Sequence, residues 1–333
     1  MHARQSALND WLKTLFTDNT FTWKPLAGDA SFRQYFRLHH GNESYIVMDA
    51  PPNKETISPF ITMNQLLAKG GIHTPAIHAL EQEQGFILLE DLGDELLLSA
   101  LANAPADNLY KAAIATLIQI QQCPTLEPQL PAFDKAHMMQ ELTLFRQWFL
   151  HDYLALQLGA DEEQLIQNTF DWIIKELERQ PQVFIHRDYH SRNLLIVGQN
   201  TPPDIGVIDF QDAMRGPFAY DLVSLLKDCY IQWPREQITN WLEYFYSNLP
   251  NNFGYTLSEF VHAFDVCGLQ RHLKVLGIFC RLHLRDKKDA YLRDLPLTFN
   301  YVMACLESYR ELQPFYHFMQ HKVQPLFIET LHA

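Results

Sequence analysis

The sequence is poor in basic residues, and this shortage excludes one broad class of partner. Its 333 residues hold 26 Lys and Arg against 39 Asp and Glu, which gives a formal net charge of −13. A general nucleic-acid binder usually carries a basic face, so we expect no nucleic-acid partner. An anionic small molecule is still compatible with this composition, because local charges in a cleft can oppose the net charge.

Cysteines and long apolar runs are also scarce. The five cysteines are scattered and form no C-x-x-C pair, which disfavours a zinc site or a redox motif and suits a reducing compartment. Residues 1–16 lack the continuous apolar core of a secretory signal, and no run is long and apolar enough to span a membrane. We therefore expect a cytoplasmic protein with no membrane partner. These features leave the oligomeric state open.

Glycine is sparse where a phosphate-binding loop would need it. Residues 23–49 read as strands around the tight turn Gly28-Asp29-Ala30-Ser31, which holds one glycine. Small residues at a turn let backbone N–H groups approach phosphates, so Gly28 and Ser31 are candidate nucleotide contacts. By itself the turn is more typical of an ordinary hairpin.

The strongest signal lies in residues 183–210. Three apolar runs, 183–185, 194–197 and 206–208, read as buried strands. The first run leads into the pattern H-R-D-x-x-x-x-N, from His186 to Asn193, which is typical of a phosphoryl-transfer catalytic loop. A turn rich in Gly, Asn and Pro separates the second run from the third, and the third ends at Asp209.

The chemistry of phosphoryl transfer accounts for these residue types. Transfer from ATP to a hydroxyl needs a carboxylate facing the hydroxyl and metal ions on the phosphates. Asp188 is the candidate carboxylate, and Asn193 and Asp209 are candidate Mg²⁺ ligands, because Mg²⁺ prefers oxygen donors. The hairpin should fold Asp209 back beside Asn193. A single Asp or Asn in a loop is more often a turn or cap residue, and His186 alone would more often be a packed histidine. The spacing between strand-like runs favours the catalytic interpretation, with His186 in structural support.

Several segments together resemble the kinase-like phosphotransferases, the superfamily of aminoglycoside and choline kinases. The match rests on Ile208-Asp209-Phe210-Gln211-Asp212 and on the segment from Gly216 to Leu222. The strings GDASFRQYFR, IVMDAPP, HRDYHSRN, IDFQDAMRGP and YDLVSLLKDCY resemble one branch more closely. That branch is the anomeric N-acetylmuramate and N-acetylglucosamine kinases of bacterial cell-wall recycling. The resemblance implies ATP and Mg²⁺ as cofactors and an amino sugar as the small-molecule partner.

The fold implied by this resemblance is α+β, bilobal and protein-kinase-like. A small antiparallel-sheet lobe should span residues 1–92 and bind the nucleotide, and a mostly helical lobe should span 93–333 and carry the sugar. The expected elements of the small lobe are helices at 6–16 and 58–69 and strands at 32–38, 44–49, 74–80 and 85–89. Glu90 to Leu92 would be the hinge whose backbone holds the adenine, and the acidic pair Glu90-Asp91 would be surface charge and helix cap. After the catalytic hairpin we expect helix through residue 330.

One position departs from the superfamily pattern. The strand lysine that usually binds the nucleotide phosphates is replaced by Met48 or Asp49. Side chains alternate along a strand, so Arg33 and Arg37 share a face and either could supply the missing cation. We favour Arg33, which is nearer the turn, and expect Asp49 to hold the arginine.

The remaining assignments concern the sugar and the loop. Tyr189, Arg192 and Gln211 flank the motif and are candidate sugar contacts. By resemblance Asp221 should accept hydrogen bonds from the catalytic-loop backbone, whereas a simple helix N-cap is the alternative. Basic residues at 281, 285, 287, 288 and 293 form a patch that is either a solvated face or a contact for an anionic substrate.

Two other functions remain open at this stage. The first is an aminoglycoside or amino alcohol kinase of the same fold, whose cationic substrate would usually need several carboxylates in the substrate lobe. The second is a nucleotide-binding pseudokinase without turnover, which only the missing lysine favours.

Overall fold

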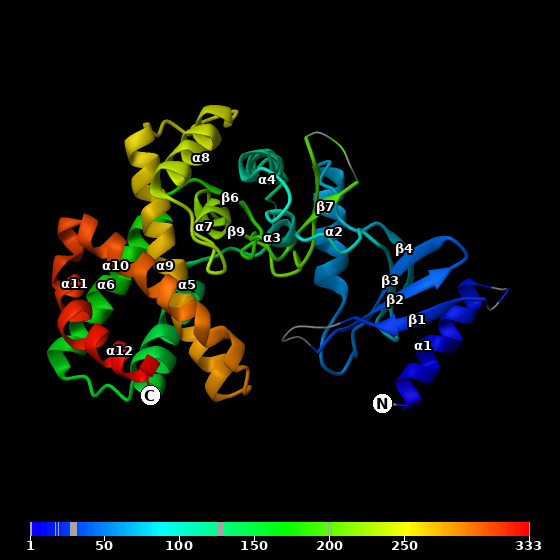
Figure 1. Cartoon of the computed structure of the whole chain (residues 1–333), viewed down its shortest axis with the longest axis horizontal. Helices are drawn as coiled ribbons and strands as arrows, with labels where there is room; N and C mark the ends of the chain where they lie inside the picture. The colour runs from blue at the N-terminus through cyan, green and yellow to red at the C-terminus, as the bar shows by residue number, and fades with distance from the viewer. Residues whose placement is uncertain are drawn as a thin grey trace. The chain divides into compact units, whose positions relative to one another are not determined.

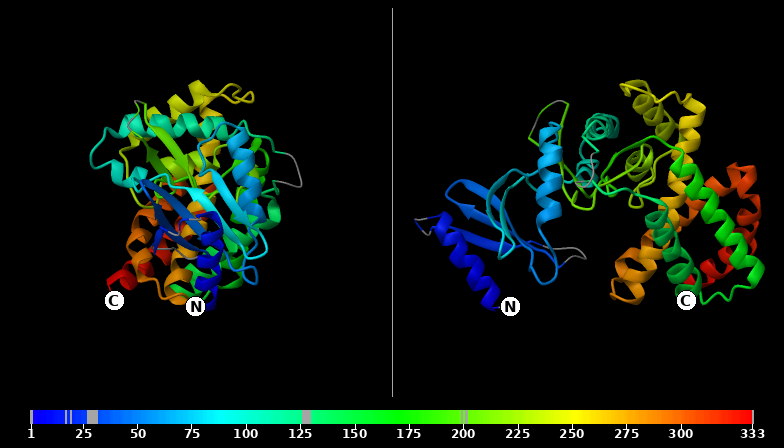
Figure 2. Two further views of the ribbon diagram at one scale, coloured as in Figure 1. Left: turned by 90° about the vertical axis from the view of Figure 1, so that its right-hand side faces the viewer. Right: turned by 180° about the vertical axis from the view of Figure 1, so that it is seen from behind.

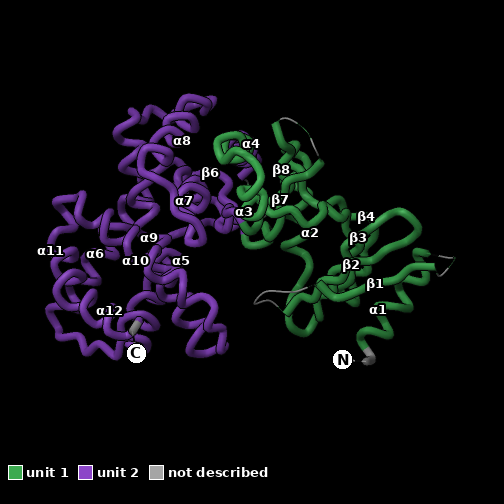
Figure 3. Tube along the Cα trace, in the orientation of Figure 1, with its two compact units in different colours: residues 1–112, 192–212 green, residues 113–191, 213–333 purple. Residues whose placement is uncertain are grey.

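The computed structural model describes residues 2–16, 18, 20–26, 32–125, 130–198, 200 and 202–332. The turn from Gly28 to Ser31 lies outside these residues, so both nucleotide contacts expected there stay predictions. The chain forms two compact units, coloured separately in Figure 3. Unit 1 comprises residues 1–112 and 192–212, and unit 2 comprises residues 113–191 and 213–333. The ribbon of the whole chain is drawn in Figure 1.

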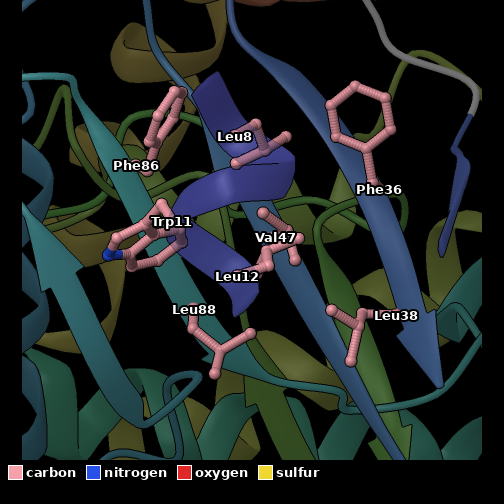
Figure 4. Packing of buried hydrophobic residues seen from close by; sticks show 8 residues of the cluster. All are labelled: Leu8, Trp11, Leu12, Phe36, Leu38, Val47, Phe86 and Leu88. Carbon is pink, nitrogen blue, oxygen red and sulfur yellow. The ribbon is translucent and has the colours of Figure 1, made fainter. Parts of the chain in front are cut away.

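Unit 1 is built around an antiparallel sheet with the strand order β1-β2-β3-β5-β4. Its strands are β1 (Thr22–Pro25), β2 (Gln34–His40), β3 (Glu43–Asp49), β4 (Ile77–Glu81) and β5 (Phe86–Glu90). Helix α1 (His2–Leu15) covers one face of this sheet, as the views of Figure 2 also show. Apolar residues of α1 pack against those of β2, β3 and β5 in the cluster drawn in Figure 4, which holds Leu8, Trp11, Leu12, Phe36, Leu38, Val47, Phe86 and Leu88. The amphipathic spacing expected for the first helix is thereby explained.

Two further parts complete unit 1. Helix α2 (Ser58–Lys69) has the expected bounds, with a proline in its first turn and Gly70 at its C-cap. The hairpin of β7 (Leu194–Val197) and β8 (Asp204–Val207) is joined to this unit, because the Ile196 N–H donates to the Glu95 carbonyl and the Val207 N–H donates to the His73 carbonyl. The hairpin therefore belongs with the sheet lobe. The helices α3 (Leu97–Ala100) and α4 (Ala106–Ile120) follow β5 in the chain.

Unit 2 is mostly helical, and α9 (Leu257–Leu284) is its longest helix. This helix, yellow to orange in Figure 1, contacts α5, α6, α7, α8 and α10 and buries most of its residues. The helical segments of the unit besides α9 are α5 (Lys135–Leu144), η1 (Phe145–Tyr153), α6 (Ala160–Glu178), α7 (Tyr220–Leu226), α8 (Arg235–Asn248), η2 (Asp289–Asp294), α10 (Leu295–Ser308), η3 (Arg310–Leu312), α11 (Gln313–Phe318), η4 (Met319–Val323) and α12 (Gln324–His332).

The expected fold class is confirmed, with one local correction. We expected helix directly after the catalytic hairpin, but β9 (Met214–Pro217) comes first and pairs antiparallel with β6 (Gln182–Ile185). This short strand is buried in the pair and has no alternating pattern in its sequence, so only its partner identifies it. None of the helices in the described part of the chain combines the length and apolar character that crossing a membrane requires.

Candidate active site

The loop that follows β6 in unit 2 carries Asp188 and is held by a buried carboxylate. Asp221, which has no exposed surface, accepts hydrogen bonds from the backbone N–H groups of His186 (2.6 Å) and Arg187 (2.9 Å). The N-cap of α7 is Ala219, so Asp221 lies inside the helix and does not cap it. The expected hydrogen bonds to the loop are confirmed, and the N-cap alternative is wrong.

A second buried carboxylate holds the other side of the loop. Asp228 accepts hydrogen bonds from the backbone N–H (3.0 Å) and the hydroxyl (2.5 Å) of Ser191, and both residues are buried. Arg187 has a φ of +76°, in the left-handed region that costs a non-glycine residue free energy. The two anchors keep the loop in this conformation around Asp188. Sequence reasoning missed Asp228, because nothing in its local pattern distinguishes it from an ordinary loop aspartate.

Cations of α9 surround the Asp188 carboxylate. The Arg271 guanidinium donates to the Arg187 carbonyl (2.8 Å) and lies 3.5 Å from Asp188 Oδ1, while the Asp188 side chain stays 43% exposed. Partial burial would raise the pKa of Asp188, but the charges of Lys274 and Arg271 hold it well below its ordinary value. Asp188 is therefore ionised and still open to a ligand.

A buried ionic cluster centred on Glu141 holds the cations near Asp188 in place. Glu141 of α5 pairs with Lys274 (3.1 Å) and Arg187 (2.5 Å) and accepts a hydrogen bond from Gln270 (2.9 Å). Burial opposes ionisation of Glu141, yet Lys274 and Arg187 lower its pKa. Because Glu141 and Asp188 share these cations, removing either carboxylate would change the field at the other.

Two residues of the loop, Tyr189 and His186, are buried in unit 2. The Tyr189 side chain is fully buried, and its hydroxyl donates to the Ala113 carbonyl (2.8 Å), so it lies in the core of unit 2 instead of on a surface that meets sugar. The expectation that Tyr189 contacts the substrate is corrected on this ground. His186 is buried beside it, with the two ring centroids 5.9 Å apart, which suits the structural role expected of this histidine.

The candidate metal ligands lie together in unit 1. The β7–β8 register pairs Leu194 with Val207, and beyond that pair the Asn193 amide donates to Asp209 Oδ2 (3.3 Å). Asp209 has a φ of +63°, which turns it out of the line of β8. The hairpin therefore brings these two residues side by side, as expected, and their oxygen donors fit Mg²⁺. Gln211, expected to contact sugar, donates to Asp209 Oδ1 (2.8 Å), and Arg192 is partly buried just before Asn193.

The arginine favoured for the phosphates is paired with a carboxylate. Arg33 forms an ion pair with Glu55 (2.8 Å) and is 9% exposed. Burial raises the pKa of the neighbouring Tyr35, the charge of Arg33 lowers it, and the charge of Asp209 raises it. The charges of Arg33 and of the candidate metal ligand Asp209 therefore both act on the Tyr35 hydroxyl. Arg37 instead pairs with Asp91 (2.7 Å) and Asp94 (2.6 Å).

The predicted partnership of Asp49 with this arginine face is wrong. The β2–β3 register pairs Asp49 with Gln34 and Val47 with Phe36, and paired residues point to the same face of a sheet. That face is covered by α1, and Asp49 bonds to Arg4 there (2.7 Å to Nε). Met48, which pairs with Tyr35, is the residue on the arginine face.

One residue of the expected hinge segment, Asp91, has a role that was not predicted from the sequence. Asp91 is an internal ion-pair partner of Arg37, and the N-cap of α3 is Leu96, so the interpretation of the acidic pair as surface charge and helix cap is wrong for Asp91. The Glu90 carboxylate accepts from the Ala76 N–H (3.1 Å), and Leu92 is buried. Because these side chains are engaged within unit 1, contact with an adenine would come from the backbone of this segment.

Comparison with known proteins identifies the family to which this chain is similar. Residues 22–253 match the phosphotransferase enzyme family. An N-acetylmuramate/N-acetylglucosamine kinase of Pseudomonas aeruginosa is 39% identical over 295 residues, covering 86% of this chain and 85% of that protein. A protein of the same name from Neisseria meningitidis serogroup B is 36% identical and covers 98% of both chains.

Solved structures with low sequence identity share the fold. An ethanolamine kinase of Plasmodium vivax gives a TM-score of 0.65 at 11% identity, covering 91% of this chain and 88% of that one. An ADP-bound aminoglycoside phosphotransferase, APH(2'')-Ib, gives 0.60 at 15% identity, covering 86% and 95%. At these identities the likeness concerns the fold alone.

Proposed function

The chain belongs to the phosphotransferase enzyme family, and we propose that it transfers a phosphoryl group from ATP to the anomeric hydroxyl of N-acetylmuramate and of N-acetylglucosamine. The observation that carries this proposal is the 36–39% identity to kinases bearing that name, over most of each chain. Asp188, Asn193 and Asp209 supply the chemical groups that such a reaction requires. We further propose that residues 1–92 bind the nucleotide and that residues 93–333 carry the catalytic loop and the sugar.

The role of Asp188 follows from its charge environment. Its carboxylate accepts the hydrogen bond of the anomeric O–H and orients the oxygen for attack on the terminal phosphorus. As the new O–P bond forms, the bond to the ADP oxygen breaks and the sugar proton passes to Asp188. Since nearby cations lower the pKa of Asp188, it is a weak base, and the proton moves late, once the oxygen has lost its electron density.

The hairpin and β2 serve the nucleotide in this proposal. Asn193 and Asp209 would hold Mg²⁺, which neutralises charge on the phosphates when bound. Arg33 would donate to the phosphates, and Glu55 would orient its guanidinium as the usual acidic partner orients a lysine. Gly28 and Ser31 would cover the phosphates, and the backbone of Glu90 to Leu92 would hold the adenine.

Two different groups of charged residues disfavour the two alternatives. A cationic aminoglycoside or amino alcohol would meet Arg271 and Lys274 beside the base, and like charges repel. The pseudokinase alternative depended on the missing lysine, and the Arg33–Glu55 pair offers a replacement for it.

Two measurements test the proposal. ATP consumption should depend on either amino sugar and be absent with aminoglycosides, choline or ethanolamine. The phosphorus NMR signal of the product made from N-acetylglucosamine should show coupling to H1. Coupling to the two H6 protons would identify a 6-kinase and contradict the proposal.

A further inference from the structure

One face of α9 carries a row of basic residues that begins beside Asp188. Successive steps of three and four residues connect Arg271, Lys274, Ile278, Arg281 and Arg285. Such steps keep side chains on the same face of a helix. The row therefore leads from the catalytic carboxylate toward the end of α9, which is orange in Figure 1.

Most of these cations have a partner in the protein. Arg271 and Lys274 are buried and pair with Asp188 and Glu141. At the other end, Arg285 is exposed and donates twice to Asp286, at 2.8 Å each. These contacts account for three of the four charges.

Arg281 is the exception in this row. Its side chain is partly buried, and its Nε has no accessible surface and no hydrogen-bond partner among the described residues. Burial and the charge of Arg285 lower its pKa, and the charge of Asp286 offsets this only in part. A partly desolvated cation costs free energy, which an anionic ligand at the exposed part of its guanidinium would recover.

The two amino sugars differ in a single anionic group. N-acetylmuramate is N-acetylglucosamine with a lactyl ether on O3, and the lactyl group ends in a carboxylate. O3 is carried by the ring carbon two positions from the anomeric carbon, and the lactyl group extends outward from it, so its carboxylate is bound away from the base. Arg281 is ten residues beyond Arg271, or about 15 Å along the helix axis, and helical side chains lean toward the N-terminal end, here back toward Asp188.

We propose that Arg281 binds the lactyl carboxylate of N-acetylmuramate and strengthens binding of that sugar relative to N-acetylglucosamine. This inference rests on the proposed function, because it requires both sugars to be substrates. A guanidinium suits the task, since it can donate two parallel hydrogen bonds to a carboxylate. Arg281 is a specificity residue in this scheme and takes no part in the transfer step.

Substitution of Arg281 provides the first test. Arg281→Met keeps the apolar stem and removes the charge, so the KM for N-acetylmuramate should rise about tenfold or more. The kcat with either sugar and the KM for N-acetylglucosamine should stay within about twofold, because no lost contact involves their shared atoms. Arg285→Met is the matched control, four residues further along the same face, and should leave both KM values unchanged. An equal change for both sugars, or no change for either, overturns the inference.

A second measurement needs no variant. N-acetylmuramate with its lactyl carboxylate converted to the amide should bind the wild-type enzyme more weakly by the same factor as Arg281→Met weakens binding of the acid. Combining the variant with the amide should add no further loss, since both changes remove one interaction. Additive losses would place the carboxylate elsewhere. If the wild-type enzyme phosphorylates neither sugar, the proposed function itself fails, whereas turnover of both sugars with additive losses defeats only the role of Arg281.

Discussion

The candidate metal ligands of unit 1, called the metal half below, and the loop around Asp188 in unit 2, called the base half, are held in different ways. Asn193 and Asp209 are 16 positions apart and meet through one hairpin. The loop around Asp188 depends on distant residues instead. Its hydrogen bonds to Asp221, Asp228 and Arg271 join residues 35, 37 and 84 positions apart. The first half is a product of local strand pairing, and the second requires α7 and α9 to be packed in place.

This difference determines which substitutions should matter. In the metal half, the residues that would bind the ion are themselves the ones whose substitution should matter most. In the base half, buried charged residues that never touch a substrate should still control the rate. Two non-glycine residues with positive φ, Arg187 and Asp209, mark the two halves, and each needs its surroundings to keep that conformation.

The largest expected effect comes from removing the base. Asp188→Asn should lower kcat by about a hundredfold or more, since it removes the proton acceptor, while nucleotide affinity stays the same. Steady-state kinetics together with equilibrium binding of ATP would measure both quantities. A variant that keeps more than about a tenth of the wild-type kcat would exclude Asp188 as the base.

Removing the candidate metal ligand should have a different signature. Asp209→Asn should lower kcat and also shift the Mg²⁺ titration to higher concentration, by about tenfold, because Mg²⁺ binds an amide oxygen less strongly than a carboxylate. Asp188→Asn serves as the comparison, since its Mg²⁺ titration should stay in place. Identical titrations for both variants would contradict the assignment of separate roles to Asp188 and Asp209.

The buried anchor should affect activity more than stability. Asp221→Ala frees two backbone N–H groups of the loop, and kcat per folded molecule should fall about tenfold or more. The matched control is Asp134→Ala, because Asp134 is a true N-cap of α5 that accepts from the His137 N–H (3.0 Å). This control should cost about 1 kcal/mol of stability with kcat unchanged. Thermal unfolding and kcat measured on both variants separate the outcomes, and an Asp221 variant with full activity per folded molecule would argue against anchoring.

A smaller effect is expected from the phosphate cation. Arg33→Met should raise the KM for ATP by about threefold to tenfold, through loss of a charge-assisted hydrogen bond, with little change in the KM for sugar. Arg37→Met is the comparison, since Asp91 and Asp94 already engage that arginine. A raised ATP KM in Arg37→Met alone would transfer the role to Arg37. Unchanged values in both variants would mean that the cation comes from elsewhere in the chain.

The smallest effect concerns pH, where a flat profile is expected. A lowered pKa means that Asp188 stays ionised as the pH falls, and it is protonated only below the ordinary aspartate value of about 4. The kcat should therefore show no acid limb from Asp188 above about pH 5. Arg271→Met removes one of the cations that lower this pKa and should move the acid limb upward. A kcat that falls with an apparent pKa near 6 in the wild type, and moves in Asp188→Asn, would contradict the charge environment described.

The sequence by itself determined the features that depend on neighbouring residues. The apolar spacing of residues 58–69 indicated α2 with its bounds, and the catalytic-loop motif with the returning strand indicated Asp188, Asn193 and Asp209. Helical and strand periodicity act over a few residues, and a hairpin places its two ends side by side by geometry alone. The same local patterns indicated the individual strands of the small sheet and many of the helices, whereas the bilobal fold was inferred from the resemblance to a known family.

Only the tertiary structure decided which distant groups meet. The register of β2 and β3 places Asp49 on the face that α1 covers, away from the face of Arg33. Arg33 pairs with Glu55 instead. The burial of Tyr189 keeps its side chain from contacting a substrate. The roles of Asp228 and Arg271 depend on α7 and α9 being folded against the loop, and nothing in their immediate sequence marks them. A charged residue becomes an anchor when packing excludes water and leaves one partner in reach, and that condition is set by contacts between residues far apart in the chain.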